Sequence, residues 1–282
     1  MTERRALCFA CAGHWLYGVL DVPAAPRTRG VLFVVGGPQY RAGSHRQFVL
    51  LARELTAQGC AAMRFDYRGM GDSEGEMRNF EDVGLDLRCA IDAFFEAVPA
   101  LREVVLWGLC DAASAAALYA ASDPRVAGLA LLNPWVRTEA GAARATLKHY
   151  YRARLFDPGL WKKIASGKFS PRAAVGSLRR LLRTADSSTN STASPAGAQS
   201  ALPGRMADSL ARFDGKLLVM LSEADLTAQE FSGLAQDDPA WKTLMGAARV
   251  TSNTLPKADH TCSRGPWHDQ LTQFTLAWVR SW

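Results

Sequence analysis

The sequence lacks any apolar stretch that approaches the ~20 residues of a membrane-spanning helix, so no transmembrane segment is expected. The apolar run near the N-terminus covers only about eight residues before Gly13 and His14, near the lower limit for a signal peptide. The same run is typical of a strand that opens a hairpin. We therefore expect a cytoplasmic protein.

Cysteine is scarce, and its spacing does not match a metal site. Six cysteines occur among 282 residues, mostly in apolar contexts, as is typical of reduced thiols in cytosolic proteins. Cys8 and Cys11 form a C-x-x-C pair, but no second pair of ligands follows at zinc-like spacing. The simpler interpretation is two strand residues that point to opposite faces of a sheet.

The remaining composition is that of an ordinary globular protein with a sizeable core, since 48% of residues are hydrophobic and 21% are charged. Apolar runs alternate with helical patterns along most of the chain. Strands are expected at 6–12, 15–22, 30–35, 60–67, 103–109, 126–134, 216–222 and 248–255, and helices at 46–58, 80–98, 111–122 and 267–282. This alternation predicts an α/β fold with a mainly parallel sheet covered by helices on both faces.

The alternation breaks in the middle of the chain. Residues 136–183 are helical in pattern and basic, and 184–204 are low in complexity, rich in Ser, Thr, Ala, Gly and Pro. We expect the first part of the core at 1–135, an insertion at 136–205 and the second part of the core at 206–282.

Reactive side chains follow several of the predicted strands. In open α/β sheets such groups gather beyond the carboxyl ends of the strands. The segments "GLCDA", "SEADLTA" and "ADHTCS" offer Cys110, then Asp225, then His260 in chain order. The order nucleophile, acid, histidine is the one used by α/β-hydrolases, whereas other triad folds use different orders.

These motifs carry a resemblance that covers nearly all of the chain except 184–204. "FDYRGMGDSEG" is similar to a strand-and-turn signature of the α/β-hydrolase superfamily, in its peptidase- and esterase-like branch. "GGPQYRAGSHRQF", "GLCDAASAA" and "ADHTCSRGPW" together resemble the first of two hydrolase types found with exosortase A systems, in bacteria that make exopolysaccharide. The resemblance implies an α/β-hydrolase fold with a helical lid insertion, and a genomic context of exopolysaccharide production.

Cys110 stands where many hydrolases have the serine of Gly-x-Ser-x-Gly. A nucleophile turn needs small residues two before and two after the nucleophile, and Gly108 and Ala112 satisfy that need. A helix that begins at 111 would lower the pKa of the thiol. The dienelactone hydrolases, also α/β-hydrolases, use a cysteine here. The competing interpretation is a small buried residue in an inactive copy.

The other predicted catalytic residues are Asp225, as the acid, and His260, as the base. Asp225 is also suited to cap the helix that "DLTAQEF" could start, and Glu223 and Asp214 are weaker competitors for the role of acid. His260 could instead be a loop residue without a partner.

An oxyanion hole requires two N–H donors. The residue after the nucleophile, Asp111, is expected to supply one from its backbone. The loop after 30–35 should supply the other, but Pro38 has no N–H, so we favour Gln39 over Gly37. Gly37, Tyr40, His45 and Trp135 are expected to line the substrate pocket.

The turn "RGMGDS" is expected to be conformational. Gly69 and Gly71 permit backbone angles that other residues avoid, and Asp66 and Arg68 are expected to hold the turn in place. The turn lacks the lysine and the spacing of a phosphate-binding loop.

These residues predict a hydrolase that uses nucleophilic cysteine acyl transfer on an ester, thioester or lactone, with no metal or organic cofactor. A thiolate is a good leaving group, so thioesters, lactones and activated esters suit it better than ordinary esters. Two alternatives remain open. One is an acyltransferase to a sugar or thiol acceptor, and the other is a non-catalytic scaffold of the exopolysaccharide machinery.

The insertion is strongly basic. Residues 141–183 contain eleven Lys or Arg and one acid, a net charge of +10 in a chain whose total is +6. One-sided charge attracts anions. We expect 136–183 to form a lid that recruits a small-molecule acyl substrate on coenzyme A or an acidic acyl carrier protein. An anionic membrane surface fits the same charge, a solvated helix face is the plainer explanation, and nucleic acid is not expected.

Overall fold

The computed structural model describes residues 2–37, 39–136 and 201–282. The segments Met1–Val136 and Gly204–Trp282 form one compact unit. The predicted insertion, with its basic lid and low-complexity stretch, lies almost wholly outside the described residues.

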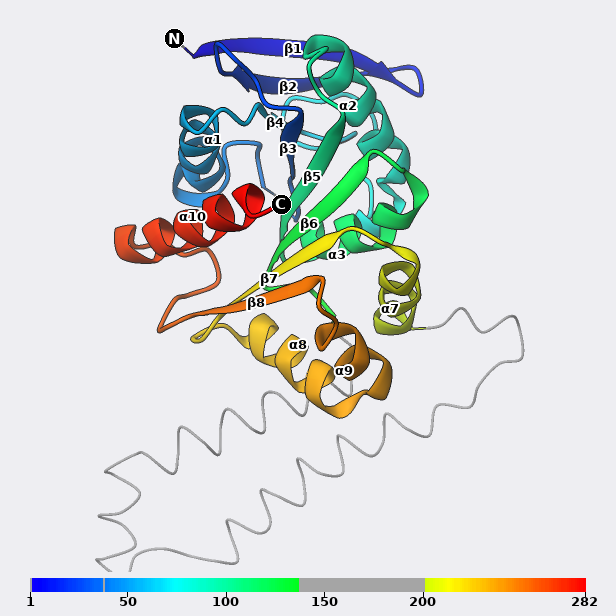
Figure 1. Cartoon of the computed structure of the whole chain (residues 1–282). Coiled ribbons are helices and arrows are strands. Elements are labelled where there is room, and N and C mark those ends of the chain that lie inside the picture. The colour runs from blue at the N-terminus through cyan, green and yellow to red at the C-terminus, as the bar shows by residue number, and fades with distance from the viewer. Residues whose placement is uncertain (1, 38, 137–200) are drawn as a thin grey trace, which may run out of the picture. The chain divides into compact units, whose positions relative to one another are not determined.

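An eight-stranded sheet forms the centre of this unit, in the order β1-β2-β4-β3-β5-β6-β7-β8 (Figure 1). Its strands are β1 (Glu3–Cys11), β2 (His14–Val22), β3 (Arg29–Val34), β4 (Ala62–Phe65), β5 (Glu103–Leu109), β6 (Val126–Leu132), β7 (Lys216–Ser222) and β8 (Val250–Leu255). Strand β2 is antiparallel to β1 and β4, and all other pairs are parallel. The predicted mainly parallel sheet is therefore confirmed, and each strand matches a predicted apolar run.

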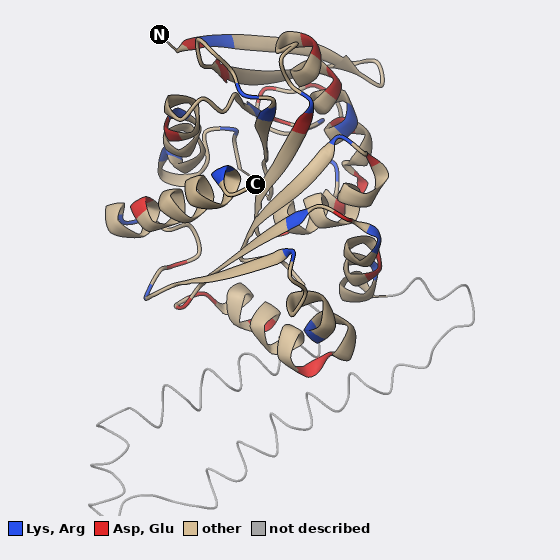
Figure 2. Cartoon of the chain, in the orientation of Figure 1, with Lys and Arg blue, Asp and Glu red and all other residues tan. Residues whose placement is uncertain are grey.

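The middle strands are apolar because they are covered on both faces. Strand β6 carries no charged residue, and the single charges of β5 and β7 stand at their first positions, as Figure 2 makes visible. Trp107 on β5 is fully buried, and its ring packs 5.5 Å from Phe33 and 5.6 Å from Phe48. This aromatic group joins the sheet to the helix that follows β3.

Helices cover both faces of the sheet. They are α1 (Gln47–Ala57), α2 (Gly84–Ala97), α3 (Asp111–Tyr119), α7 (Leu202–Arg212), α8 (Leu226–Asp237), α9 (Pro239–Met245) and α10 (Gly265–Arg280), with short 3₁₀ turns at Ser44–Arg46, Phe80–Asp82 and Ala120–Ser122. Helices α1 and α10 lie on one face, and α2 and α3 lie on the other (Figure 1). The sequence predicts α1, α2, α3 and α10 but not α7 or α9. Within the described ranges, no helix has the length and apolar character needed to cross a membrane.

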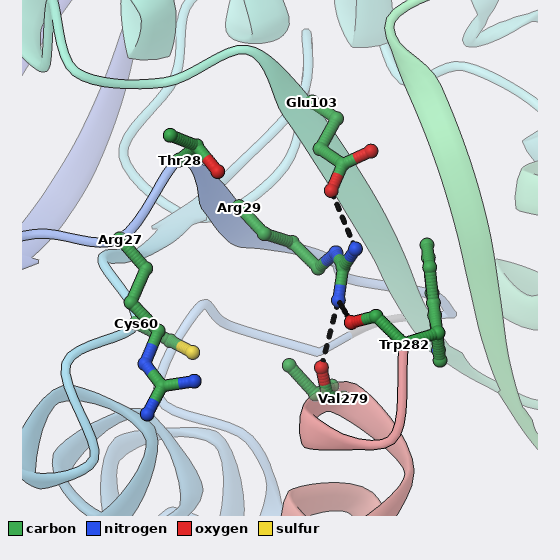
Figure 3. A pocket seen from close by; sticks show the side chains of 7 residues that line it. All are labelled: Arg27, Thr28, Arg29, Cys60, Glu103, Val279 and Trp282. Carbon is green, nitrogen blue, oxygen red and sulfur yellow. Dashed lines mark hydrogen bonds and ion pairs between the residues drawn. The ribbon is translucent and has the colours of Figure 1, made fainter.

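A cavity of about 360 Å³ lies where β3 and β5 begin, next to the last residues of the chain (Figure 3). Arg29 reaches across it and donates hydrogen bonds to the carboxylate of Glu103 and to the backbone carbonyls of Val279 and Trp282. These bonds tie the end of α10 to the sheet. None of the predicted site residues lines this cavity, which lies at the opposite end of the strands from the loops that carry them.

Candidate active site

Cys110 occupies a strained turn between β5 and α3. Its backbone angles, φ 60° and ψ −121°, are uncommon for a residue with a side chain. A Cβ on Gly108 would lie 2.6 Å from the carbonyl of Ala112, and Ala112 itself is buried. The turn therefore needs small residues at both positions, as the sequence predicts.

The strained backbone of Cys110 is held by hydrogen bonds on both sides. Its N–H donates to the carbonyl of Leu132 at 2.9 Å, and its carbonyl accepts from the N–H of Trp135 at 3.2 Å. The half-buried thiol precedes the first N–H groups of α3, which have no partner inside the helix. The turn thus presents a thiol at the positive end of a helix dipole.

Asp225 and His260 meet at the ends of β7 and β8. The Nδ1 atom of His260 lies 3.0 Å from Oδ1 of Asp225. The second carboxylate oxygen of Asp225 accepts from the N–H of Ala228 at 3.0 Å and caps α8. Asp225 therefore has both roles that the sequence allows for it. Glu223 is engaged elsewhere, because it accepts from the N–H of Lys257.

The electrostatics of His260 reflect both of its neighbours. A hydrogen bond with Asp225, and then one with Cys110, raise the pKa of His260 to about 10, although burial acts in the opposite direction. Since Nδ1 faces Asp225, Nε2 is the ring nitrogen left for Cys110. The structure thus brings the three predicted residues together, and its charges favour an imidazolium.

The loop after β3 is fastened by the side chain of Asp111. One carboxylate oxygen accepts from the N–H of Gly37 at 2.7 Å, and the other accepts from the N–H of Ala112 at 2.9 Å. A Cβ on Gly36 would lie 2.0 Å from Oδ1 of Asp111, so that residue must be glycine. Burial raises the pKa of Asp111, and its backbone hydrogen bonds partly offset this effect.

This contact removes one candidate oxyanion donor. The N–H of Gly37 already donates to Asp111, so Gln39 remains the predicted backbone donor on this loop, together with the N–H of Asp111. The side-chain oxygen of Gln39 is buried and has no hydrogen-bond partner among the described residues. The bond from Gly37 to Asp111 agrees with the preference for Gln39, whose role as the second donor stays a prediction.

The family model described as serine aminopeptidase, S33, matches residues 26–188, more than half of the chain. The chain belongs to this α/β-hydrolase family. Its fold and hydrolase class agree with the sequence prediction, whereas the family model does not single out the exosortase-associated type. No curated protein matches the sequence significantly.

Solved structures of other α/β-hydrolases share the fold at low sequence identity. The esterase Pf2001 of Pyrococcus furiosus has a TM-score of 0.65 and 12% identity, with 99% of this chain and 91% of that chain covered. Est1E of Butyrivibrio proteoclasticus, solved with ferulic acid bound, has a TM-score of 0.62 and 15% identity over 97% and 99%. The esterase domain of a Rhodothermus marinus protein has a TM-score of 0.59 and 17% identity over 99% and 98%.

Two serines could be considered as alternative nucleophiles, but the hydroxyl groups of both form hydrogen bonds with the backbone. Residues 71–75 read Gly-Asp-Ser-Glu-Gly and formally fit Gly-x-Ser-x-Gly, yet Ser73 donates to the carbonyl of Asp66 and accepts from the N–H of Tyr17. Ser114 is fully buried and donates to the carbonyl of Trp135 at 2.5 Å. Neither hydroxyl stands at a strand-to-helix turn, so neither competes with Cys110.

The turn "RGMGDS" is held as the sequence predicts. Asp66 accepts from the N–H of Arg41 at 2.7 Å, and Arg68 forms a bidentate pair with Asp86 at 2.8 Å. A Cβ on Gly71 would lie 2.2 Å from the carboxylate of Asp66. These contacts are structural, and they also fix the loop that carries Gln39.

The predicted pocket residues of the hydrolase occupy three segments. Tyr40 is 45% exposed, and its hydroxyl donates to Asp72 at 3.2 Å. His45 is exposed and adopts a left-handed backbone, with φ 53°, just before α1. Trp135 is half-buried beside Cys110. The N–H of Gly37 donates to the side chain of Asp111, and the N–H of Trp135 donates to the carbonyl of Cys110, so both residues contact the turn that carries Cys110. A pocket role for all four residues stays a prediction.

The structure offers no metal centre within the residues it describes, because no group of three or more His, Cys, Asp or Glu side chains is close enough to hold an ion. Cys8 is exposed and Cys11 is buried, as expected for strand residues on opposite faces. The sequence names Cys110, Asp225, His260, Asp111 and Trp135 in advance, whereas the side-chain bonds of Asp111 and the role of Asn133 after β6 are visible only in the structure.

Proposed function

We propose that this α/β-hydrolase transfers an acyl group to Cys110 and then to water, with His260 and Asp225 as its catalytic partners. The observation that carries the proposal is the joint placement of a strained, half-buried Cys110 and an imidazole that is bonded to both the cysteine and a carboxylate. This is the relation of nucleophile, base and orienting acid that acyl transfer requires.

The proposed reaction has two steps. In the resting pair His260 already holds the proton of the Cys110 thiol, and the thiolate attacks the substrate carbonyl carbon while the N–H groups of Asp111 and Gln39 bind the oxyanion. His260 then gives the proton to the departing oxygen or sulfur, and a thioester with Cys110 remains. Water, deprotonated by His260, attacks this thioester, the acid is released, and the thiolate of Cys110 is again paired with a protonated His260.

The protonation of His260 supports a cysteine nucleophile. With its pKa raised to about 10, His260 is positively charged near neutral pH. A serine mechanism needs a neutral imidazole to remove the hydroxyl proton, whereas a cysteine can rest as a thiolate paired with an imidazolium. The site is therefore better suited to Cys110 than to a serine in the same place.

The proposed substrates are thioesters, lactones and activated esters. A thiolate is expelled easily from a tetrahedral intermediate, so the first step is efficient only when the other leaving group is at least as good. Several structural neighbours are esterases, which supports a carboxylic acyl substrate. The +10 charge of residues 141–183 supports an anionic thioester carried by coenzyme A or an acyl carrier protein.

A role in exopolysaccharide production belongs to the same proposal. Its support is the resemblance of "GGPQYRAGSHRQF", "GLCDAASAA" and "ADHTCSRGPW" to hydrolases found with exosortase A systems. Hydrolysis and transfer share the acyl-thioester intermediate, and they differ only in the acceptor of the second step.

The deciding experiment traps the acyl group. Wild type and Cys110→Ala are mixed with p-nitrophenyl acetate, quenched in acid within milliseconds and analysed by peptide mass spectrometry. We expect acetyl on the peptide containing Cys110, and no burst of nitrophenol in Cys110→Ala. Cys89→Ala is the matched control, because Cys89 is also half-buried but lies on α2. Acetylation of a serine, or full activity in Cys110→Ala, would contradict the proposal.

A further inference from the structure

The segment that follows β6 contacts all three loops of the candidate site. The carbonyl of Leu132 accepts from the N–H of Cys110, and the N–H of Trp135 donates to the carbonyl of Cys110. Between them, the side chain of Asn133 reaches the loops that carry Asp225 and His260. The sequence analysis assigns no role to Asn133.

The backbone of Asn133 explains in part why asparagine stands here. Its φ of 47° lies in the left-handed region, which asparagine tolerates better than most residues with a side chain. Its N–H donates to the carbonyl of Met220 at 3.0 Å, and the residue is fully buried. Glycine would meet the backbone requirement equally well, so the side chain must be explained separately.

Every polar atom of the Asn133 side chain is used. Its Oδ1 accepts from the N–H of Ser222 at 2.8 Å, and its Nδ2 donates to Oγ of Ser222 and to the carbonyl of His260, both at 3.1 Å. The amide orientation is unambiguous, because a backbone N–H can only donate and a backbone carbonyl can only accept. An aspartate could not make the same set of bonds.

One of these three bonds acts on the catalytic base directly. Ser222 is the last residue of β7, and its carbonyl accepts from the N–H of Asp225 at 3.2 Å. Asn133 therefore connects the strand end that leads to the acid with the backbone of the histidine. The bonds to Ser222 use Oδ1 and one N–H of the amide. The second N–H binds the carbonyl of His260, the residue whose ring must meet both Asp225 and Cys110.

We propose that Asn133 is a positioning residue, which holds the backbone of His260 in register with Asp225 and Cys110. This inference rests on the proposed function, because it assigns no chemistry of its own. Its consequence is kinetic, since displacement of a catalytic group by about 1 Å can cost roughly 10²-fold in rate. Substrate binding should change little, because Asn133 is buried and cannot touch the substrate.

The test compares Asn133→Asp with wild type, using p-nitrophenyl acetate. The aspartate keeps an acceptor for the N–H of Ser222 and places an oxygen against the carbonyl of His260, where two acceptors repel. We expect kcat to fall about 10–100-fold and KM to stay within about twofold. Full wild-type kcat in a folded Asn133→Asp protein would overturn the proposal.

The pH profile separates positioning from a general loss of structure. A displaced His260 loses part of its bond to Asp225, so the alkaline limb of the kcat profile should move below that of wild type. The other ionisable groups facing His260 are Cys110 and Asp111, and the substitution leaves both in place. A variant that is only partly unfolded would show a lower kcat by the same factor at every pH, and the alkaline limb of its profile would not shift.

Two further variants keep the test decisive. Asn133→Gly removes the amide without adding charge and allows the same backbone, so it replaces Asn133→Asp if the aspartate variant does not fold. Thr275→Val is the stability control, because Thr275 is fully buried on α10, and we expect it to lower the melting temperature without changing kcat. If Asn133→Gly retains the wild-type kcat and alkaline limb, the positioning role is wrong.

The proposed function and this inference fail in different ways. Activity in Cys110→Ala would refute the acyl-transfer mechanism, and the positioning role would fall with it. An inactive Cys110→Ala together with unaffected Asn133 variants would leave the mechanism intact and refute only the positioning role.

Discussion

Two cysteines, Cys110 and Cys60, lie at opposite ends of the parallel strands of the sheet, and their thiols have opposite surroundings. Cys110 follows the C-terminal end of β5, is half-buried and stands beside His260. Cys60 precedes β4 at the other end, is 1% exposed, and burial raises its pKa although Arg27 and Arg29 are nearby. The difference shows that the local surroundings of a thiol, rather than the residue type, decide its exposure and its charged neighbours.

The two ends also use their polar groups differently. At the N-terminal end, Arg29 is bonded to Glu103 and to two carbonyls of α10, so its charge serves cohesion (Figure 3). At the C-terminal end, Asp111, Asp225 and Asn133 fix separate loops around one thiol. Hydrogen bonds and ion pairs thus stabilise the fold at the N-terminal end of the strands, and the same kinds of bonds position the candidate site at the C-terminal end.

The largest expected effect tests the comparison directly. Cys110→Ala should lower kcat/KM for p-nitrophenyl acetate about 10⁴-fold or more, as removal of a nucleophile does in other triad enzymes. Cys60→Ala should leave kcat/KM within about twofold, because the residue lies far from the chemistry and only a small volume is lost. Similar losses in both variants would show that the two ends do not differ in function.

The second effect concerns the acid that orients His260. Asp225→Asn should lower kcat about 10²–10⁴-fold, because the amide can no longer stabilise an imidazolium at 3.0 Å. Glu223→Gln is the matched control, since Glu223 follows the same strand but binds the N–H of Lys257. If the two variants lose activity equally, the acid has been assigned to the wrong residue.

Thiol labelling gives a smaller effect that needs no substrate. Iodoacetamide at pH 7 should modify Cys110 at least about tenfold faster than Cys60 or Cys262 in the folded protein. Burial raises the pKa of Cys262 to about 11, and both reference residues are no more than 3% exposed. Faster labelling of Cys262 would remove the argument that His260 activates Cys110.

The sequence predicts the sheet and the three central residues for a physical reason. A strand buried on both faces must be apolar, so each run from 30–35 to 216–222 is visible without a structure. Cys110, Asp225 and His260 each follow such a run closely, and their chain order is informative. Asp111 and Asn133 are different, because their partners lie 74 and 127 residues away in loops whose approach no local pattern encodes.

Two glycines, Gly30 at the start of β3 and Gly36 just after its end, allow smaller changes at the two ends of the strand. Gly36→Ala should lower kcat about 10–100-fold, because its Cβ would displace Asp111 and the loop that carries Gln39. In Gly30→Ala, at the other end of the strand, the Cβ would lie 2.7 Å from the ring of Phe94. That variant should lose about 1–3 kcal/mol of unfolding free energy and keep its kcat. Chemical denaturation and steady-state kinetics on the same samples distinguish these outcomes.

The smallest expected effect is a dependence of stability on pH that arises at the C-terminal end alone. The pKa of His260 is raised from 6.5 to about 10, so its stabilising contribution is complete below about pH 6.5 and is lost as the pH rises through about 10. The ionisable groups named among the causes of this shift are Asp225 and Cys110, and Asp111 is a further ionisable group close to His260.

The measurement is the melting temperature of wild type and His260→Ala between pH 6.5 and 10. Buried thiols such as Cys262 also destabilise the fold at high pH, but they do so in both proteins and cancel in the difference. Wild type should therefore exceed His260→Ala by most at the acid end of this window, and the gap should narrow as the pH rises. A gap that stays constant or widens toward pH 10 would mean that His260 is not held as an imidazolium, and the distinction between the two ends of the sheet would then rest on Cys110 alone.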